Sequence, residues 1–133
     1  MTMRFTARVA GVDDSDCLVA GVAEHEDSTG RSLIFQAAQE PPDDQEIRLG
    51  MDTYCLVTES QGTAYGCVEE IVIDRDQLRI VLRKDALADL DLNDDVVEVE
   101  LAADPEATQT FRDMLREILA YGRDNARPTV VRL

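Results

Sequence analysis

The sequence holds a single histidine and lacks the motifs of the common hydrolases and nucleotide-binding enzymes. It contains no G-x-S-x-G elbow, no glycine-rich phosphate loop opening a helix and no H-E-x-x-H metal motif. A Cys–His nucleophile would have to join His25 to one of three cysteines in apolar runs, where burial disfavours a reactive thiolate. Carboxylates are plentiful, but most lie in loops beside other acids, as on a solvated surface. We therefore predict that the chain is no enzyme and binds no cofactor.

Cysteines and long apolar runs are also scarce. Cys17, Cys55 and Cys67 are odd in number and have no C-x-x-C spacing, which favours reduced, buried thiols over a disulfide framework or a zinc site. We predict no bond between Cys55 and Cys67. Residues 1–8 alternate polar and apolar side chains, unlike a signal peptide, and no run approaches the length of a membrane span. These features predict a cytoplasmic protein without membrane contact.

Positively charged residues are also few. Thirteen Lys and Arg residues face 28 Asp and Glu residues, which gives a formal charge of -15 at pH 7. Such a surface repels nucleic acids and attracts basic partners, with a steering effect that fades over roughly 8 Å at physiological salt. We predict no nucleic-acid binding. Acidity that simply maintains solubility and a monomeric state is the more common explanation of such a charge, and a basic partner is the second.

Hydrophobic residues make up 44% of the 133 residues and charged residues 31%, which is typical of one folded domain. We place this domain at residues 1–122 and expect a loose tail at residues 123–133. Period-2 patterns and apolar runs predict strands over residues 5–9, 17–23, 31–38, 68–74, 78–83 and 96–101, and in both arms of a hairpin over 49–68. Consecutive hairpins predict an α+β fold built on a largely antiparallel meandering sheet.

Two helices complete this predicted fold. Asp85 can cap a short helix over residues 86–90. Asp104 and Pro105 are typical of a helix start, and an apolar stripe continues to Tyr121 before Gly122, so an amphipathic helix packs on the sheet.

Three segments carry more specific expectations. Residues 17–23 are apolar throughout and predict a central strand covered on both faces, whereas residues 96–101 predict a half-exposed strand and an edge. Turns are expected over residues 11–16, and residues 39–46 predict an acidic loop stiffened by proline, either a crossing between sheet edges or an exposed rim for a partner. Beyond Pro128, residues 129–131 either stay loose or pair with a sheet edge or a second copy; we expect them to be loose.

The loop over residues 24–30 places His25 between carboxylates, a pattern that fits a metal ligand or a general base. The sequence offers no second ligand cluster and no calcium-loop pattern, so we expect a solvated hairpin loop. Two alternative functions follow from these segments. One is a small-ligand or metal-binding module at this loop, and the other is a structural homodimer formed by edge strands around Val97 and by the tail.

Three stretches resemble a known family: L-G-M-D-T-Y-C at residues 49–55, Y-G-C-V-E at residues 65–69 and E-x-E-D-S-T-G-R-x-L at residues 24–33. They are similar to the Imm10-like immunity proteins of bacterial polymorphic toxin systems, over roughly the first four fifths of the chain. The family often has a second glycine where this chain has Cys67. The resemblance implies a cytoplasmic protein that binds and blocks a toxin encoded beside it, without catalysis.

A small acidic protein is suited to blocking a basic toxin such as a nuclease, because complementary charge accelerates capture. We therefore predict that an acidic surface binds the cognate toxin, with the protein either a monomer or a homodimer. The candidate residues lie in three loops and are Asp13, Asp14, Asp16, Glu24, Glu26, Asp27, Asp43 and Asp44.

Overall fold

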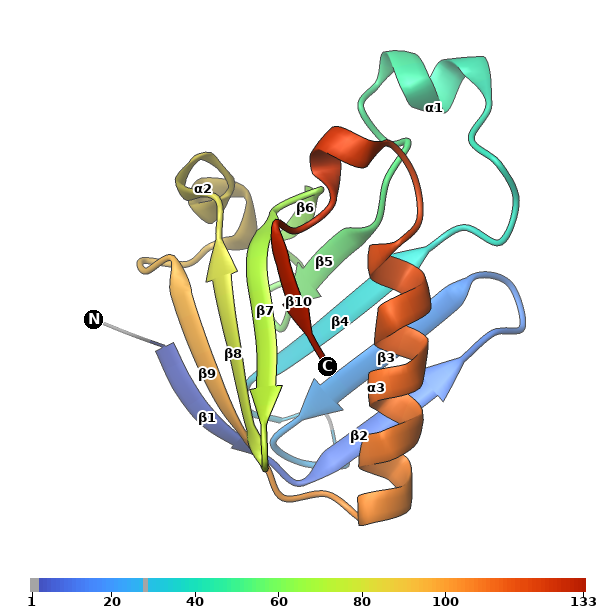
Figure 1. Cartoon of the computed structure of the whole chain (residues 1–133). Coiled ribbons are helices and arrows are strands. Elements are labelled where there is room, and N and C mark those ends of the chain that lie inside the picture. Colours follow the sequence, from blue (N-terminus) through green and yellow to red (C-terminus); the bar gives the residue numbers. More distant parts are fainter. Residues whose placement is uncertain (1–2, 28) are drawn as a thin grey trace.

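The computed structural model describes residues 3–27 and 29–133, which form two five-stranded sheets and one long helix (Figure 1). Met1, Thr2 and Ser28, from the N-terminal segment and the His25 loop, lie outside the described residues. The mixed sheet has the order β1 (Met3–Ala7), β9 (Val96–Leu101), β8 (Gln77–Leu82), β7 (Val68–Asp74) and β10 (Val130–Arg132). The antiparallel sheet has the order β2 (Val9–Asp13), β3 (Leu18–Ala23), β4 (Ser32–Ala37), β5 (Cys55–Thr58) and β6 (Thr63–Tyr65).

The predicted α+β class is confirmed, and the hairpins β3–β4, β5–β6 and β7–β8 form where the sequence patterns place them. The hairpins do not all join one meander, because the N-terminal strand divides at Arg8. Residues before Arg8 pair with β9 and residues after it pair with β3, so one continuous segment contributes to both sheets. The turn expected at Gly11 begins only after Asp13, since Gly11 pairs with Gly21 as part of β2.

The core lies between the inner faces of the two sheets. Alternate residues of β4 and β8 point inward, so that Leu33, Phe35, Leu78 and Ile80 are all fully buried. This alternation is the period-2 pattern on which the strand predictions rest.

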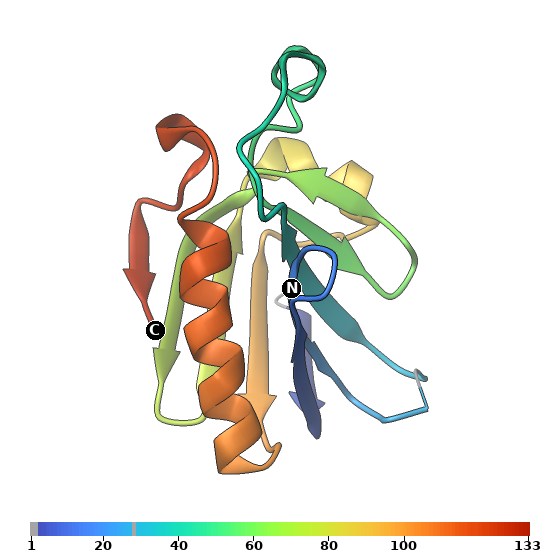
Figure 2. The ribbon, with the colours of Figure 1, turned by 90° about the vertical axis from the view of Figure 1, so that its right-hand side faces the viewer.

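Helix α3 (Pro105–Leu119) begins as predicted, with the Asp104 carboxylate accepting from the backbone N–H of Glu106 at 3.1 Å and of Ala107 at 3.3 Å. It packs on β2, β3 and β4 and fills the side that the sheets leave open (Figure 2). Its buried stripe consists of Phe111, Leu115, Ile118 and Leu119. The predicted amphipathic helix is therefore confirmed, together with its packing on a sheet.

Two sequence expectations about sheet edges are wrong. β9 lies between β1 and β8 and is no edge, because β1 pairs with it in parallel from Met3 opposite Val97 onward. The expected loose tail instead forms the short 3-10 helix η2 (Asp124–Ala126) and then β10, which pairs in parallel with β7. The pairing alternative for residues 129–131 is thus the one that occurs, and the backbone around Val97 has both partners within the chain.

The short helices include one that the sequence predicts and one that it does not. The predicted helix near residues 86–90 appears as the 3-10 helix η1 (Lys84–Ala86) followed by α2 (Leu87–Leu90), without a side-chain cap from Asp85. Helix α1 (Asp44–Arg48) begins within the acidic loop predicted over residues 39–46 and continues two residues beyond it. No helix formed by the described residues is long and apolar enough to cross a bilayer.

Candidate partner-binding surface

The outer face of the antiparallel sheet is uncovered, because α3 and the mixed sheet pack against its other face. Residues that pair across neighbouring strands form rows over this face from β2 to β6. One of these rows runs from Gly11 through Gly21 and Ile34 to Val57. We call this surface the open face; it consists of Val9, Gly11, Val19, Gly21, Ala23, Ser32, Ile34, Gln36, Cys55, Val57 and Tyr65. None of these side chains is charged; the one charged residue in the same registered rows is Asp13, which lies opposite Val19 at the end of β2. β3 is therefore covered on one face only, contrary to the sequence expectation.

Glycines make this surface shallowly concave. Gly11 and Gly21 lie directly opposite each other, and a hollow of about 290 Å³ lies over them, lined mainly by apolar side chains such as Val19 and Ile34. A Cβ atom added at Gly11 would meet no atom within 4 Å. The hollow therefore offers space and apolar contact to a ridge on another molecule.

The predicted acidic residues do not form one patch. Two hairpin turns lie at opposite ends of β3, whose six residues separate the turns by about 20 Å. Helix α1 lies at the first end, where the side-chain amide of Gln39 donates to the Asp14 carbonyl. The structure therefore places Asp13, Asp14, Asp16, Asp43 and Asp44 at one end of the open face, and Glu24, Glu26 and Asp27 at the other. We call these the near and far acidic clusters.

Several of these carboxylates also close their own turns. Asp13 accepts from the Ser15 backbone N–H at 2.9 Å, which is the main reason that its pKa is lowered. Asp27 accepts from the Thr29 hydroxyl at 2.6 Å and the Thr29 N–H at 3.0 Å, and these bonds likewise lower the pKa of Asp27. Glu24 accepts from the Arg31 N–H at 2.8 Å. The lowered pKa values of Asp13 and Asp27 keep both side chains charged at neutral pH.

His25 is exposed in the far turn. Across residues 3–27 and 29–133, no group of three or more His, Cys, Asp or Glu side chains is arranged as a metal site.

Residues 39–52 form a protrusion that we call the α1 arm; it leaves the sheet after β4 and returns before β5 (Figures 1 and 2). Helix α1 has no buried residue, and Ile47 and Leu49 are 52% and 63% exposed. This helix is not among those predicted from the sequence, although the spacing of Asp43 and Glu46 is that of a capping box. Asp43 accepts from the Glu46 N–H at 2.8 Å, and Glu46 accepts from the Asp43 N–H at 3.3 Å.

The base of the α1 arm is tied to the end of α3. Asp52, almost buried, forms an ion pair with Arg123, and its carbonyl accepts from the Arg123 N–H at 3.2 Å. The Tyr121 hydroxyl donates to the Glu40 carbonyl at 3.0 Å. Between these contacts, Gly122 has φ of +91°, and a Cβ atom there would lie 2.2 Å from the Asp52 carbonyl oxygen. Only glycine allows the two segments to approach so closely.

The α1 arm and the open face are contiguous. Glu46 and Met51 of the arm, with Gln36, Cys55 and Tyr65 of the open face, contribute to the lining of a hollow of about 170 Å³. Burial raises the pKa of the Cys55 thiol to about 11, so it stays neutral and contacts Gln36 Oε1 at 3.8 Å. The arm therefore extends the same surface beyond the sheet.

Two of the stretches that carry the family resemblance meet beneath the α1 arm. Asp52, from the first, binds Arg123; Gly66, from the second, has φ of +60°, and its Cβ position lies 2.9 Å from the Ala126 side chain. Cys67 is 1% exposed, which fits a small side chain in a close contact. These residues shape the base of the surface and expose no catalytic group.

A comparison with protein families matches residues 6–109 to immunity protein 10. The match covers more than half of the chain, which therefore belongs to the immunity protein 10 family, a class defined by the neutralisation of toxins. The predicted resemblance is confirmed, and the matched range contains the whole open face and the whole α1 arm. No curated protein and no solved structure matches the chain.

Proposed function

We propose that this immunity protein neutralises a basic cognate toxin in the cytoplasm by binding it, without catalysis, over the open face and the acidic clusters at its ends. The observation that carries the proposal is an uncharged sheet face left uncovered between acidic clusters, in a chain of net charge -15. Contiguous apolar surface with a polar rim is typical of a protein interface. Family membership supports a toxin as the partner.

Charge explains why the toxin would be basic. An acidic frame attracts a cationic enzyme from a distance and accelerates encounter, while it repels the polyanion on which a nuclease acts. The same protein would then bind quickly and compete with an anionic substrate. A nuclease is accordingly the toxin class that fits best.

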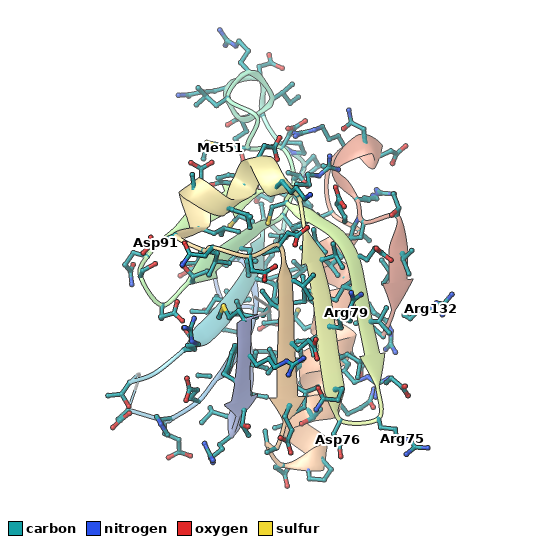
Figure 3. The ribbon with its side chains drawn as sticks, turned by 90° about the vertical axis from the view of Figure 1, so that its left-hand side faces the viewer. Met51, Arg75, Asp76, Arg79, Asp91 and Arg132 are labelled. Carbon is teal, nitrogen blue, oxygen red and sulfur yellow. The ribbon has the colours of Figure 1, made fainter. Side chains whose placement is uncertain are left out.

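The outer face of the mixed sheet offers no comparable surface. Arg4, Glu98 and Arg79 follow one another across neighbouring strands, and an Arg4 nitrogen lies 3.6 Å from a Glu98 oxygen. Figure 3 shows Arg79 and Arg132 on this side and Arg75 and Asp76 at the β7–β8 turn. Charges of both signs spread over a sheet face are typical of a solvated surface. This side therefore favours neither a strongly acidic nor a strongly basic partner.

A second copy of the chain fits the open face less well than a basic partner does. Sheets pack face to face either nearly aligned or at right angles. Because both ends of the open face are acidic, either aligned orientation brings acidic clusters of the two copies together. We propose that the protein binds the toxin as a monomer.

The test uses the polypeptide encoded beside this gene, produced with an inactivating substitution. One variant combines Asp14→Asn, Asp16→Asn and Glu26→Gln, which do not close the turns; the control combines Asp74→Asn, Asp76→Asn and Glu100→Gln, which are exposed and belong to the mixed sheet. Both variants lose three negative charges. The first should associate at least about tenfold more slowly at low salt and rescue growth poorly, and the control should resemble the wild type. Equal losses in the two variants would leave only a net-charge effect and contradict the proposed surface.

A further inference from the structure

We infer that the α1 arm inserts into a concave, basic site on the toxin and blocks access to that site. This inference rests on the proposed function and goes further, because it assigns the part of the toxin that is occupied.

The arm exposes apolar side chains to solvent. Ile47, Leu49 and Met51 are 52%, 63% and 37% exposed, and α1 buries none of its residues against the rest of the chain. Exposed apolar side chains gathered on one protruding segment gain nothing from the fold and are typical of contact sites. Their burial in a cleft would supply the central, desolvated part of an interface.

The charge around the apolar side chains of the arm is mostly negative. Carboxylates flank the apolar tip, and Arg48 is the only cation among residues 39–52. A site that accepts this arm therefore needs Lys or Arg side chains around an apolar floor. An enzyme that acts on a polyanion has such a site. The flanking acids are Glu40, Asp43, Asp44 and Glu46.

Hydrogen bonds within the arm and at its two ends hold it in one conformation before it binds. The capping box closes the start of α1, and the Met51 N–H donates to the Glu46 carbonyl at 2.8 Å across Gly50, which has φ of +73°. The contacts of Glu40 with Tyr121 and of Asp52 with Arg123 hold both ends of the arm. A segment that is already ordered loses little conformational entropy on binding, which favours affinity.

The arm of a second copy would not find this site on the chain itself. The hollow of about 550 Å³ beside the arm is lined by Glu40 and by the ion pair of Asp52 with Arg123, as well as by Ile47 and Tyr121. The cation of this lining is already paired with Asp52, so the hollow does not supply the basic surroundings that the acidic arm needs. The molecule that accepts the arm is therefore the basic toxin and not a second copy of the chain.

One variant, Ile47→Ser with Leu49→Ser, removes the apolar tip and leaves every charge in place. The control, Val81→Ser with Val131→Ser, changes a half-buried side chain of β8 and a 45% exposed side chain of β10, both on the mixed sheet and away from the arm and the open face. The arm variant should raise the Kd for the inactivated neighbouring polypeptide roughly 30-fold, and the control should leave it within about twofold. Unchanged affinity in the arm variant would overturn the inference.

A photo-crosslinking amino acid placed at position 49, and separately at position 34 of the open face, locates the contact. Position 49 should crosslink to toxin peptides that contain Lys or Arg residues required for toxicity. Crosslinking from position 34 alone, or from position 49 to toxin residues that are dispensable for toxicity, would overturn the arm's role and leave the proposed function standing. A wild-type chain that does not bind the neighbouring polypeptide would overturn both.

Discussion

The buried hydroxyl of Tyr54 donates a hydrogen bond to the Ala126 carbonyl, 3.0 Å away and 72 residues later in the chain. The same oxygen accepts from the Val68 backbone N–H at 3.1 Å. One side chain thus joins the segment beneath the α1 arm, the start of β7 and the helical turn η2 before β10. Burial raises the pKa of Tyr54 far above its usual value, so the hydroxyl keeps the proton that it donates.

Replacing Tyr54 by Phe should lower the free energy of unfolding by about 1–3 kcal/mol, because the Ala126 carbonyl and the Val68 N–H lose this partner in a buried place. Residues 126–133 should become more sensitive to protease. Urea denaturation and limited proteolysis measure the two effects. Tyr65→Phe, at a position 38% exposed, is the control and should leave both unchanged.

Gly122→Ala should lower the free energy of unfolding by more than about 2 kcal/mol, since the residue has φ of +91° and its Cβ atom would meet the Asp52 carbonyl at 2.2 Å. Gly11→Ala places its methyl group in open space and should change stability by less than about 1 kcal/mol. Thermal denaturation of the two variants checks the contrast. Equal losses would contradict the close approach of α3 to the base of the arm.

Stability should fall as the pH rises from about 9 toward 12. Burial raises the pKa of the Cys67 thiol from 9.0 to about 12, so above pH 9 the folded chain binds more protons than the unfolded chain. The stabilisation is complete below pH 9 and is lost through this interval. Urea denaturation at pH 8 and pH 10.5 should show a smaller difference for Cys67→Ala than for the wild type or Cys17→Ala. An identical difference in all three proteins would rule out Cys67 as a source of the slope.

Arg123→Gln should release the α1 arm while changing overall stability by no more than about 1 kcal/mol, because the Arg123 side chain is 39% exposed and its ion pair with Asp52 is partly screened. Hydrogen exchange at the amides of residues 47–51 should become faster. Arg4→Gln, which breaks the exposed pair with Glu98 on the mixed sheet, should leave these amides unaffected. Unchanged exchange in Arg123→Gln would show that the other contacts suffice to hold the arm.

The sequence predicts elements whose signals are local. The Asp104 cap, Pro105 and the stripe from Phe111 to Leu119 define α3, and alternation defines the inward residues of β4 and β8. The exchange of sheets at Arg8 and the parallel partners of β1 and β10 could not be predicted, because such pairings depend on residues far apart in the chain. A period-2 pattern says which face is buried and does not name the neighbour.

The candidate surface shows the same limit. The eight acidic residues could be chosen from their loops, but only the antiparallel course of β3 separates Asp13 from Glu24 and leaves uncharged residues between them. The apolar run of β3 suggested burial on both faces. The sequence pattern is the same whether the second face of such a strand is covered by the chain itself or left uncovered. The capping-box spacing of Asp43 and Glu46 was the signal in the sequence that could have predicted α1, and with it the helical part of the arm.

The pairing of β1 with β9 also bears on how quickly the protein can protect a cell. Thr6 lies beside Glu100, 94 residues later, so β1 finds its neighbour only after most of the chain has been made. At ordinary synthesis rates this delay is roughly 5–20 s, during which the first strand lacks the partner that secures it. Contacts so distant in sequence also slow folding itself. β1 is therefore fixed in place only after β9 has been synthesised, long after β1 itself.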